Sequence, residues 1–260
     1  MKRILSLFLS ILFIMSICGS AFGTDGGKVV LEKNEITDIK ILYDKASNRD
    51  TDDPTDIKKF KAVLEGAPGY MVANKKVTTQ KVREVEHADG SIESFYVTTT
   101  FADIKKPITL ASTSNNLAWC LLAASKGWDE DDSSISWRHV GTFTYSSYRD
   151  PSTNLWVKPE KIDCKWYQLD SQVALTEGKY GMQWWGSNGS TFVGDSDYLY
   201  TPIPVSLGSN YSNTCKSVGG GGYINVTPIG CYVAGVQQSK LKRNTTTWTF
   251  KSDYLFGENM

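Results

Sequence analysis

The chain has 260 residues, of which 28 are basic and 28 acidic, so its formal net charge is zero. Such a balance offers no broad positive field for nucleic acid, and no polybasic stretch suits anionic lipid. We therefore expect neither partner. A chain of this length can bury a full core as one large domain or two smaller ones.

The first 23 residues have the layout of a secretory signal peptide. Lys2 and Arg3 precede an uncharged apolar run over residues 4–17, and the small residues Ala21 and Gly23 come just before an expected cleavage site. The run is shorter than the roughly 20 residues of a membrane-spanning helix, and no comparable run follows it. We expect a bacterial type of signal, removal of residues 1–23, and a secreted chain without a transmembrane segment.

Lipidation of Cys18, which would attach the protein to the cell surface, is an alternative fate for this segment. Ile17 argues against it, because a smaller residue usually precedes a lipidated cysteine. Removal of the signal also removes Lys2 and Arg3, which leaves 26 basic and 28 acidic residues.

Four cysteines remain in the expected mature chain: Cys120, Cys164, Cys215 and Cys231. An even number in an exported protein predicts two disulfides, with three possible connectivities. We favour Cys120–Cys164 and Cys215–Cys231, because cysteines that are neighbours in sequence pair most easily. A zinc site is disfavoured because no two of these cysteines form a CxxC pair.

Residues 24–110 are expected to form a small α+β unit. Alternating apolar residues over 36–43 predict a half-buried strand. A helix is predicted to start at Asp53 and to end at Gly66. Asp89 and Gly90 then lie between two β-rich runs, which is the pattern of a hairpin with a two-residue turn.

Residues 111–260 are expected to form an antiparallel β-sandwich. The segment 115–128 fits a short helix or a buried strand, and we favour the helix. Period-two alternation then recurs over residues 135–145, 161–169 and 179–184, and further short strands are predicted over 201–208, 223–236 and 245–250. The fold class is thus mainly β, a disulfide-bonded antiparallel β-sandwich with a small N-terminal α+β unit.

Two adjacent tryptophans raise the question of function. Successive side chains of a strand point to opposite faces, so Trp184 and Trp185 cannot both enter one core. Trp184 continues the apolar phase of its strand, whereas Trp185 falls on the other face. Exposed rings on a rigid sheet suit flat ligands such as sugars, and nearby amides supply hydrogen bonds. We predict that Trp185, Asn188, Trp156 and Tyr148 bind a ligand.

No catalytic site, metal or cofactor is predicted. The motifs GxSxG and HExxH are absent, and the two histidines are expected to be a hydrogen-bonded core residue, His139, and a solvent-exposed residue, His87. The acidic runs 50–56 and 129–132 could bind calcium, but solvated turns explain them better.

The expected function is recognition of an extracellular ligand, carbohydrate before protein, by a secreted module that is not an enzyme. Two alternatives remain open. A glycoside hydrolase would need paired carboxylates; the candidates are Asp163, Asp170, Glu177 and Glu160. A membrane-acting β-toxin is suggested by the Ser/Thr-rich strands at 95–104 and 141–148.

Overall fold

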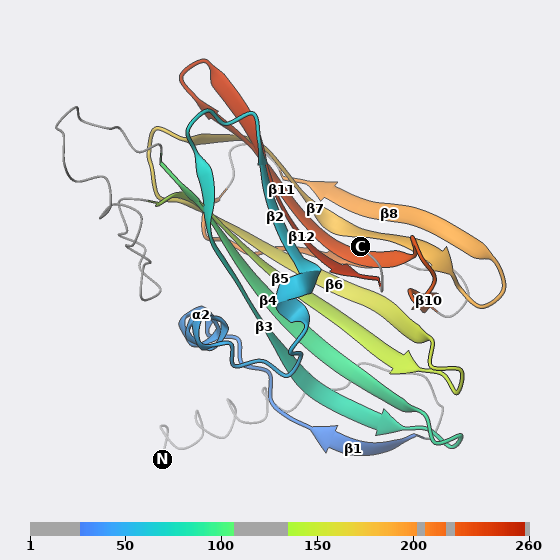
Figure 1. Cartoon of the computed structure of the whole chain (residues 1–260). Helices are drawn as coiled ribbons and strands as arrows, with labels where there is room; N and C mark the ends of the chain where they lie inside the picture. The colour runs from blue at the N-terminus through green and yellow to red at the C-terminus, as the bar shows by residue number, and fades with distance from the viewer. Residues whose placement is uncertain (1–26, 107–134, 202–205, 217–221, 258–260) are drawn as a thin grey trace, which may run out of the picture.

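A computed structural model describes residues 27–106, 135–201, 206–216 and 222–257 (Figure 1). These residues form two short helices and one 12-stranded sheet. The elements are β1 (Lys28–Glu32), α2 (Ile39–Asn48), α3 (Asp56–Lys59), β2 (Phe60–Glu65), β3 (Met71–Glu86), β4 (Ile92–Lys105), β5 (Ile135–Arg149), β6 (Leu155–Gln168), β7 (Ala174–Ser187), β8 (Phe192–Tyr200), β9 (Tyr211–Thr214), β10 (Ile224–Asn225), β11 (Tyr232–Arg243) and β12 (Thr246–Phe256).

Every strand pairing in the sheet is antiparallel. The main order is β1-β3-β4-β5-β6-β10-β7-β11-β12-β2, with β8 beside β7 and β9 beside β6. The predicted mainly β, antiparallel architecture is confirmed. Because β4 pairs with β5, the segments 24–110 and 111–260 contribute strands to the same sheet.

The sheet folds over on itself into two packed layers (Figure 1). We call β1, β3, β4, β5 and β6 the first layer, and β2, β12, β11, β7 and β8 the second layer. The short β10 pairs with both β6 and β7 and so joins the two layers where the sheet folds over. Rings from β5 meet rings from β12, since the centroids of Tyr145 and Phe256 lie 4.3 Å apart and those of Phe143 and Tyr254 lie 6.3 Å apart.

Alternate residues of the long strands build the core between the layers. Large inward side chains include Trp137, Trp166 and Tyr145 from the first layer and Trp184, Trp248 and Phe250 from the second. Gly235 permits a close approach, because a Cβ atom there would lie 2.9 Å from Cδ2 of Phe143. The alternation that predicted these strands is therefore also the pattern that fills the core.

His139 ties the two layers together through hydrogen bonds. Its Nδ1 lies 2.8 Å from Oγ of Ser252 and its Nε2 lies 2.6 Å from Oγ of Ser239, while its ring packs on Phe250 at a centroid distance of 4.3 Å. Burial holds the pKa of His139 well below its ordinary value, so the ring is neutral. The predicted hydrogen-bonded core histidine is confirmed.

The strand predicted over 36–43 is wrong, because this segment leads into helix α2. Asp38 caps the helix, since its Oδ1 accepts hydrogen bonds from the backbone N–H groups of Lys40 and Ile41. Leu42, Tyr43 and Ala46 pack against the outer face of the first layer, on Phe101 and Val140. The spacing of apolar residues in this segment fits both the strand period of two and the helical period of about 3.6. The Asp38 cap favours the helix.

The helix predicted from Asp53 to Gly66 is also wrong. Only α3 forms there, and Phe60 then starts β2, which pairs with β12. Phe60 is buried and Leu64 packs on the core. Burial of alternate residues in a strand therefore overrides the helical spacing of the apolar residues. A hairpin does join β3 to β4, with Gly90 at a φ of 80°, but its connection spans residues 87–91, so the predicted two-residue turn does not form.

The two predicted disulfides are not confirmed. In the part of the chain described here no disulfide is present: Cys164 is a buried thiol, and Cys215 and Cys231 are not joined to each other. Burial raises the pKa of the Cys164 thiol well above its ordinary value, so it stays protonated and unreactive. Cys120 and the ambiguous segment 115–128 lie outside the described residues. Within those residues, neither helix is long and apolar enough to span a membrane.

We predict that His139→Gln removes a pH-dependent part of the stability. The folded state holds His139 neutral, whereas in the unfolded chain it titrates near 6.5. Stability from this group is therefore complete above that pH and is lost as the pH falls below it, by up to about 1.4 kcal/mol per pH unit. Urea unfolding at about pH 7.5 and about pH 5.5 should show a smaller acid loss for the variant. An equal loss of stability at acid pH in both proteins would contradict the interpretation of His139 as a buried, neutral residue.

Candidate functional site

The two adjacent tryptophans of β7 point in opposite directions, as the sequence predicts. Trp184 is 5% exposed and belongs to the core, whereas Trp185 is 48% exposed. Trp185 therefore lies on the outer face of the second layer, the face turned away from the first layer. Because it contributes little to the core, its role has to be sought on that outer face.

Trp185 belongs to a group of five rings that we call the aromatic platform. Antiparallel register places side chains that lie opposite each other on the same face, and Trp185 lies opposite Gly194 of β8 and Tyr232 of β11. Side chains two positions before and two positions after Gly194 on β8 also lie on this face. The aromatic platform consists of Trp185, Phe192, Tyr198, Tyr200 and Tyr232.

The indole of Trp185 is held flat against the sheet by its neighbours. A Cβ atom at Gly194 would lie 1.9 Å from Cε3 of Trp185, so the ring occupies the space that any larger residue at Gly194 would fill. The ring of Phe192 meets it edge to face, with centroids 5.0 Å apart and planes at 72°. The side of the indole turned away from the sheet is left available for contact.

Polar groups between the rings fix the middle of the platform. Gln183 accepts a hydrogen bond from the hydroxyl group of Tyr198, and its Nε2 donates to the hydroxyl oxygen of Tyr232 at 2.6 Å. The ammonium group of Lys179 lies 3.6 Å from the ring centroid of Tyr198. Burial raises the pKa of Tyr198 to about 12, so its hydroxyl stays protonated. These contacts hold the rings in place before any ligand arrives.

A buried carboxyl group, that of Asp253 on β12, lies beside the platform. The register runs from Asp253 through Val236 and Gly181 to Tyr198, so its carboxyl group lies on the same outer face. Its Oδ1 atom is buried and has no hydrogen-bond partner in the part of the chain that the structure describes. Burial raises the pKa of Asp253 to about 6, although Lys251 and Lys179 lower it. The atom is enclosed by neighbouring side chains, so it is a buried unsatisfied acceptor and not one that a ligand on the surface can reach.

The four residues predicted to bind a ligand fall in two places. Trp156 and Tyr148 are cross-strand neighbours on β6 and β5, stacked with centroids 6.1 Å apart, and Trp156 Nε1 donates to Asp150. Asn188 closes the β7–β8 turn, since its Oδ1 accepts from the backbone N–H groups of residues 190 and 191. The turn touches Trp156 at Gly189, but only Trp185 belongs to the platform.

Sequence reasoning missed several residues of the platform. Phe192, Gly194 and Gln183 do not stand out until the register of β7 and β8 is known. A signal was present in the segment 192–200, where Phe192, Tyr198 and Tyr200 share one phase of the alternation. Tyr232 and Asp253 come from strands that the sequence alone does not place beside β7.

The acidic residues considered for hydrolysis do not form a single group. Asp170 is paired with Lys106, Glu160 lies near Lys158, and Glu177 is on β7. Asp163 alone lines a groove on the outer face of the first layer. Within the described ranges, no cluster of three or more metal-ligand side chains is found. His87 lies at the β3–β4 hairpin, with Nε2 3.1 Å from Glu93.

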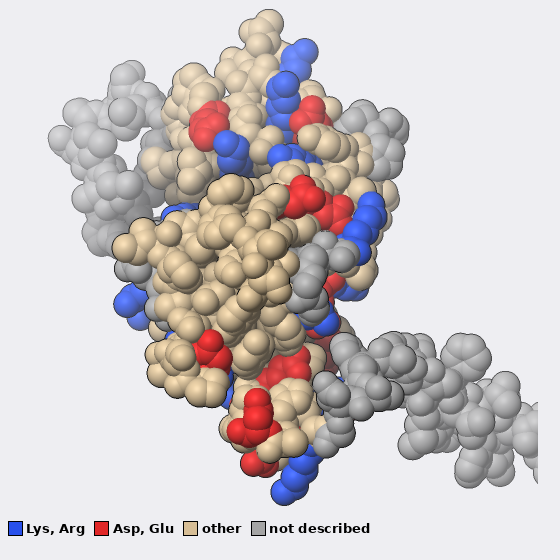
Figure 2. All heavy atoms as spheres, turned by 90° about the vertical axis from the view of Figure 1, so that its right-hand side faces the viewer, with Lys and Arg blue, Asp and Glu red and all other residues tan. Residues whose placement is uncertain are grey.

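The end of the molecule that carries the β7–β8 turn has little charge. Residues 186–192 and 226–232 contain no charged side chain, and Phe192 and Ile229 are exposed there. Figure 2, which looks at the right-hand side of Figure 1, shows a broad central area without Lys, Arg, Asp or Glu, with charged side chains around its border. This surface suits an uncharged partner better than a strongly charged one.

Comparisons with known proteins do not add to this picture. The chain matches no family model, no curated protein and no solved structure.

The two tryptophans make a matched pair for a stability test. We expect Trp184→Ala to lower the free energy of unfolding by about 3–5 kcal/mol, because it opens a cavity in the core. Trp185→Ala should lower it by about 1 kcal/mol or less, since the ring is half exposed. Urea unfolding of both variants measures the difference. Similar losses would mean that Trp185 is a structural residue and that the platform is not a free surface.

Proposed function

We propose that this protein is an exported, non-catalytic module that binds an extracellular carbohydrate on the aromatic platform. The observation that carries the proposal is the outward indole of Trp185, which lies flat over Gly194 and is nearly half exposed. A rigid aromatic face contributes a large contact area and loses little conformational entropy on binding.

The chemistry of the platform suits a sugar. The C–H faces of a pyranose ring are apolar and stack on an indole, while its hydroxyl groups need hydrogen-bond partners at the edges of the contact. Gln183 and Lys179 lie between the rings and bring an amide and an ammonium group to the contact. Low charge around the β7–β8 turn favours a neutral glycan over a polyanion.

The length of the platform favours a chain of sugars over a single unit. Trp185 and Lys179 are six residues apart on β7, and Tyr200 lies opposite Lys179. At about 3.3 Å per residue this distance is roughly 20 Å. A glycan lying along β7 and β8 would therefore contact Trp185 at one end and Tyr200 at the other.

Export and disulfide formation belong to the same proposal. The layout of residues 1–23 supports secretion, and an exported chain would meet the oxidising conditions in which disulfides form. Binding on the aromatic platform does not depend on these disulfides, because the layers are held by packing and by the His139 hydrogen bonds.

The test is a glycan array, followed by titration calorimetry with the glycan that binds best. We expect Trp185→Ala to weaken binding by at least about 10-fold, which corresponds to about 1.4 kcal/mol, and Trp185→Phe to keep part of the affinity. Gly194→Val keeps the indole but displaces it from the sheet, so it should also weaken binding.

Trp156→Ala is the matched control, because this ring lies on the first layer and should leave the affinity unchanged. If Trp156→Ala abolishes binding while Trp185→Ala does not, the glycan binds at the other predicted aromatic pair. If no glycan binds the wild-type protein, the proposed function is wrong.

A further inference from the structure

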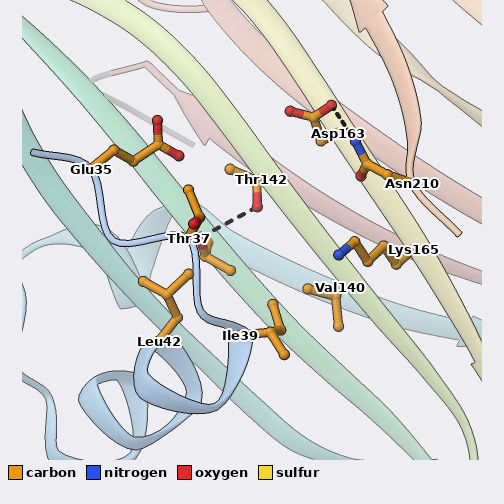
Figure 3. A pocket seen from close by; sticks show the side chains of 10 residues that line it. Glu35, Thr37, Ile39, Leu42, Val140, Thr142, Asp163, Lys165 and Asn210 are labelled. Atoms are coloured by element: carbon orange, nitrogen blue, oxygen red, sulfur yellow. Dashed lines mark hydrogen bonds between the residues drawn. The ribbon is translucent and has the colours of Figure 1, made fainter. Parts of the chain in front are cut away.

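Whereas the aromatic platform lies on the outer face of the second layer, a hollow lies on the outer face of the first layer. It has a volume of about 240 Å³ and is bounded by the segment that leads into α2 and by β4, β5 and β6 (Figure 3). We call it the outer groove. Its lining residues are Glu35, Thr37, Ile39, Leu42, Thr99, Val140, Thr142, Asp163, Lys165 and Asn210.

Two opposite charges line the outer groove. Figure 3 shows the Glu35 carboxyl group and the Lys165 ammonium group reaching into the groove from opposite walls. In the part of the chain that the structure describes, neither group makes a hydrogen bond or an ion pair. Lys161, in contrast, is paired with Asp163 at 2.8 Å. The two lysines of β6 therefore differ: Lys161 has a carboxylate partner, whereas Lys165 does not have one among the described residues.

The Glu35 carboxylate is held in an environment that disfavours its charge. Partial burial raises its pKa, Lys161 acts in the opposite direction, and the negative charge of Asp163 raises it further. A cationic group placed between Glu35 and Asp163 would offset this penalty. The Glu35 end of the groove therefore favours an ammonium group.

Asp163 is fixed in position at that same end. Its Oδ1 accepts hydrogen bonds from Asn210 Nδ2 at 2.9 Å and from the Ser212 hydroxyl group, while Lys161 lies at its Oδ2. These donors orient the Asp163 carboxyl group. With Lys161 beside Asp163, this end of the groove carries two carboxylates and one ammonium group, a net charge of −1, and the other end carries Lys165.

The middle of the outer groove is mixed in character. The hydroxyl groups of Thr99 and Thr142 lie 3.3 Å apart, and Ile39, Leu42 and Val140 supply an apolar surface. Such a surface accommodates a short carbon skeleton between two charged ends.

We propose that the outer groove binds a small zwitterion with the chemistry of a free α-amino acid. Its ammonium group would lie between Glu35 and Asp163, and its carboxylate would lie on Lys165. A neutral sugar would leave both charges unmatched, a metal cation would be repelled by Lys165, and a simple anion would be repelled by Glu35 and Asp163. This site is independent of the carbohydrate platform, because the two lie on outer faces of different layers.

The experiment titrates the mature chain with each common free amino acid by calorimetry. For the best binder, the matched amide, which lacks the carboxylate, and the N-acetyl derivative, which lacks the ammonium group, are titrated in parallel. We expect the zwitterion to bind at least about 10-fold more tightly than either derivative, because each derivative leaves one end of the groove unpaired. Binding of the derivatives with equal affinity, or no binding of any amino acid at millimolar concentration, would overturn the proposal.

Substitutions then assign the two ends. Lys165→Met and Glu35→Gln should each weaken binding of the zwitterion by about 10-fold or more, with little change in melting temperature, because both side chains lie at the surface of the groove. Lys179→Met is the control, since it removes a lysine from the platform and should leave amino-acid affinity unchanged. Unchanged affinity in both groove variants would place the ligand elsewhere. Glycan binding should survive Lys165→Met, so failure of one proposal is distinguishable from failure of the other.

Discussion

The structure depends on the burial of one face of a long antiparallel sheet against another part of the same sheet. Side chains of a strand alternate between its two faces, so folding the sheet over places every second residue in a common core and every other residue on an outer face. The inward set includes Trp137, Trp166 and Trp184. Both candidate sites lie on the outward set, and their positions follow directly from this division.

Two kinds of contact keep the layers in one arrangement. Aromatic rings of β5 and β12 interdigitate, and His139 makes hydrogen bonds to serines of β11 and β12. Packing alone tolerates small shifts between layers, whereas a buried polar side chain with two partners penalises them. A rigid core is what allows the outer rings to stay ordered without a ligand.

On each face of the second layer a glycine allows an aromatic ring to pack directly on the backbone. Gly235 faces inward and makes room for the ring of Phe143, while Gly194 faces outward and makes room for the indole of Trp185. In both cases an aromatic ring packs on bare backbone, which fixes its orientation. The inner glycine helps to bring the layers together, and the outer glycine leaves one face of an indole exposed.

The sequence predicts the alternation well but not the pairing of strands. The parity of Trp184 and Trp185 and the core role of His139 follow from period two alone. Helix α2 was mistaken for a strand because Ile39 and Tyr43 fit both periods, and only the Asp38 cap distinguishes them. The platform needs the register, which joins Trp185 to Gly194, and the outer groove needs the packing of the segment before α2 on the first layer, which places Glu35 in the same groove as Asp163. No local pattern contains that information.

Hydroxyl-radical footprinting with residue-level mass spectrometry tests the division into two faces most directly. We expect Trp185, Phe192 and Tyr200 to be oxidised rapidly, and Trp137, Trp166 and Trp184 to be protected until the protein unfolds. Equal oxidation of Trp184 and Trp185 in the native protein would contradict the account, because the folded sheet requires one of these rings to be enclosed and the other to face solvent.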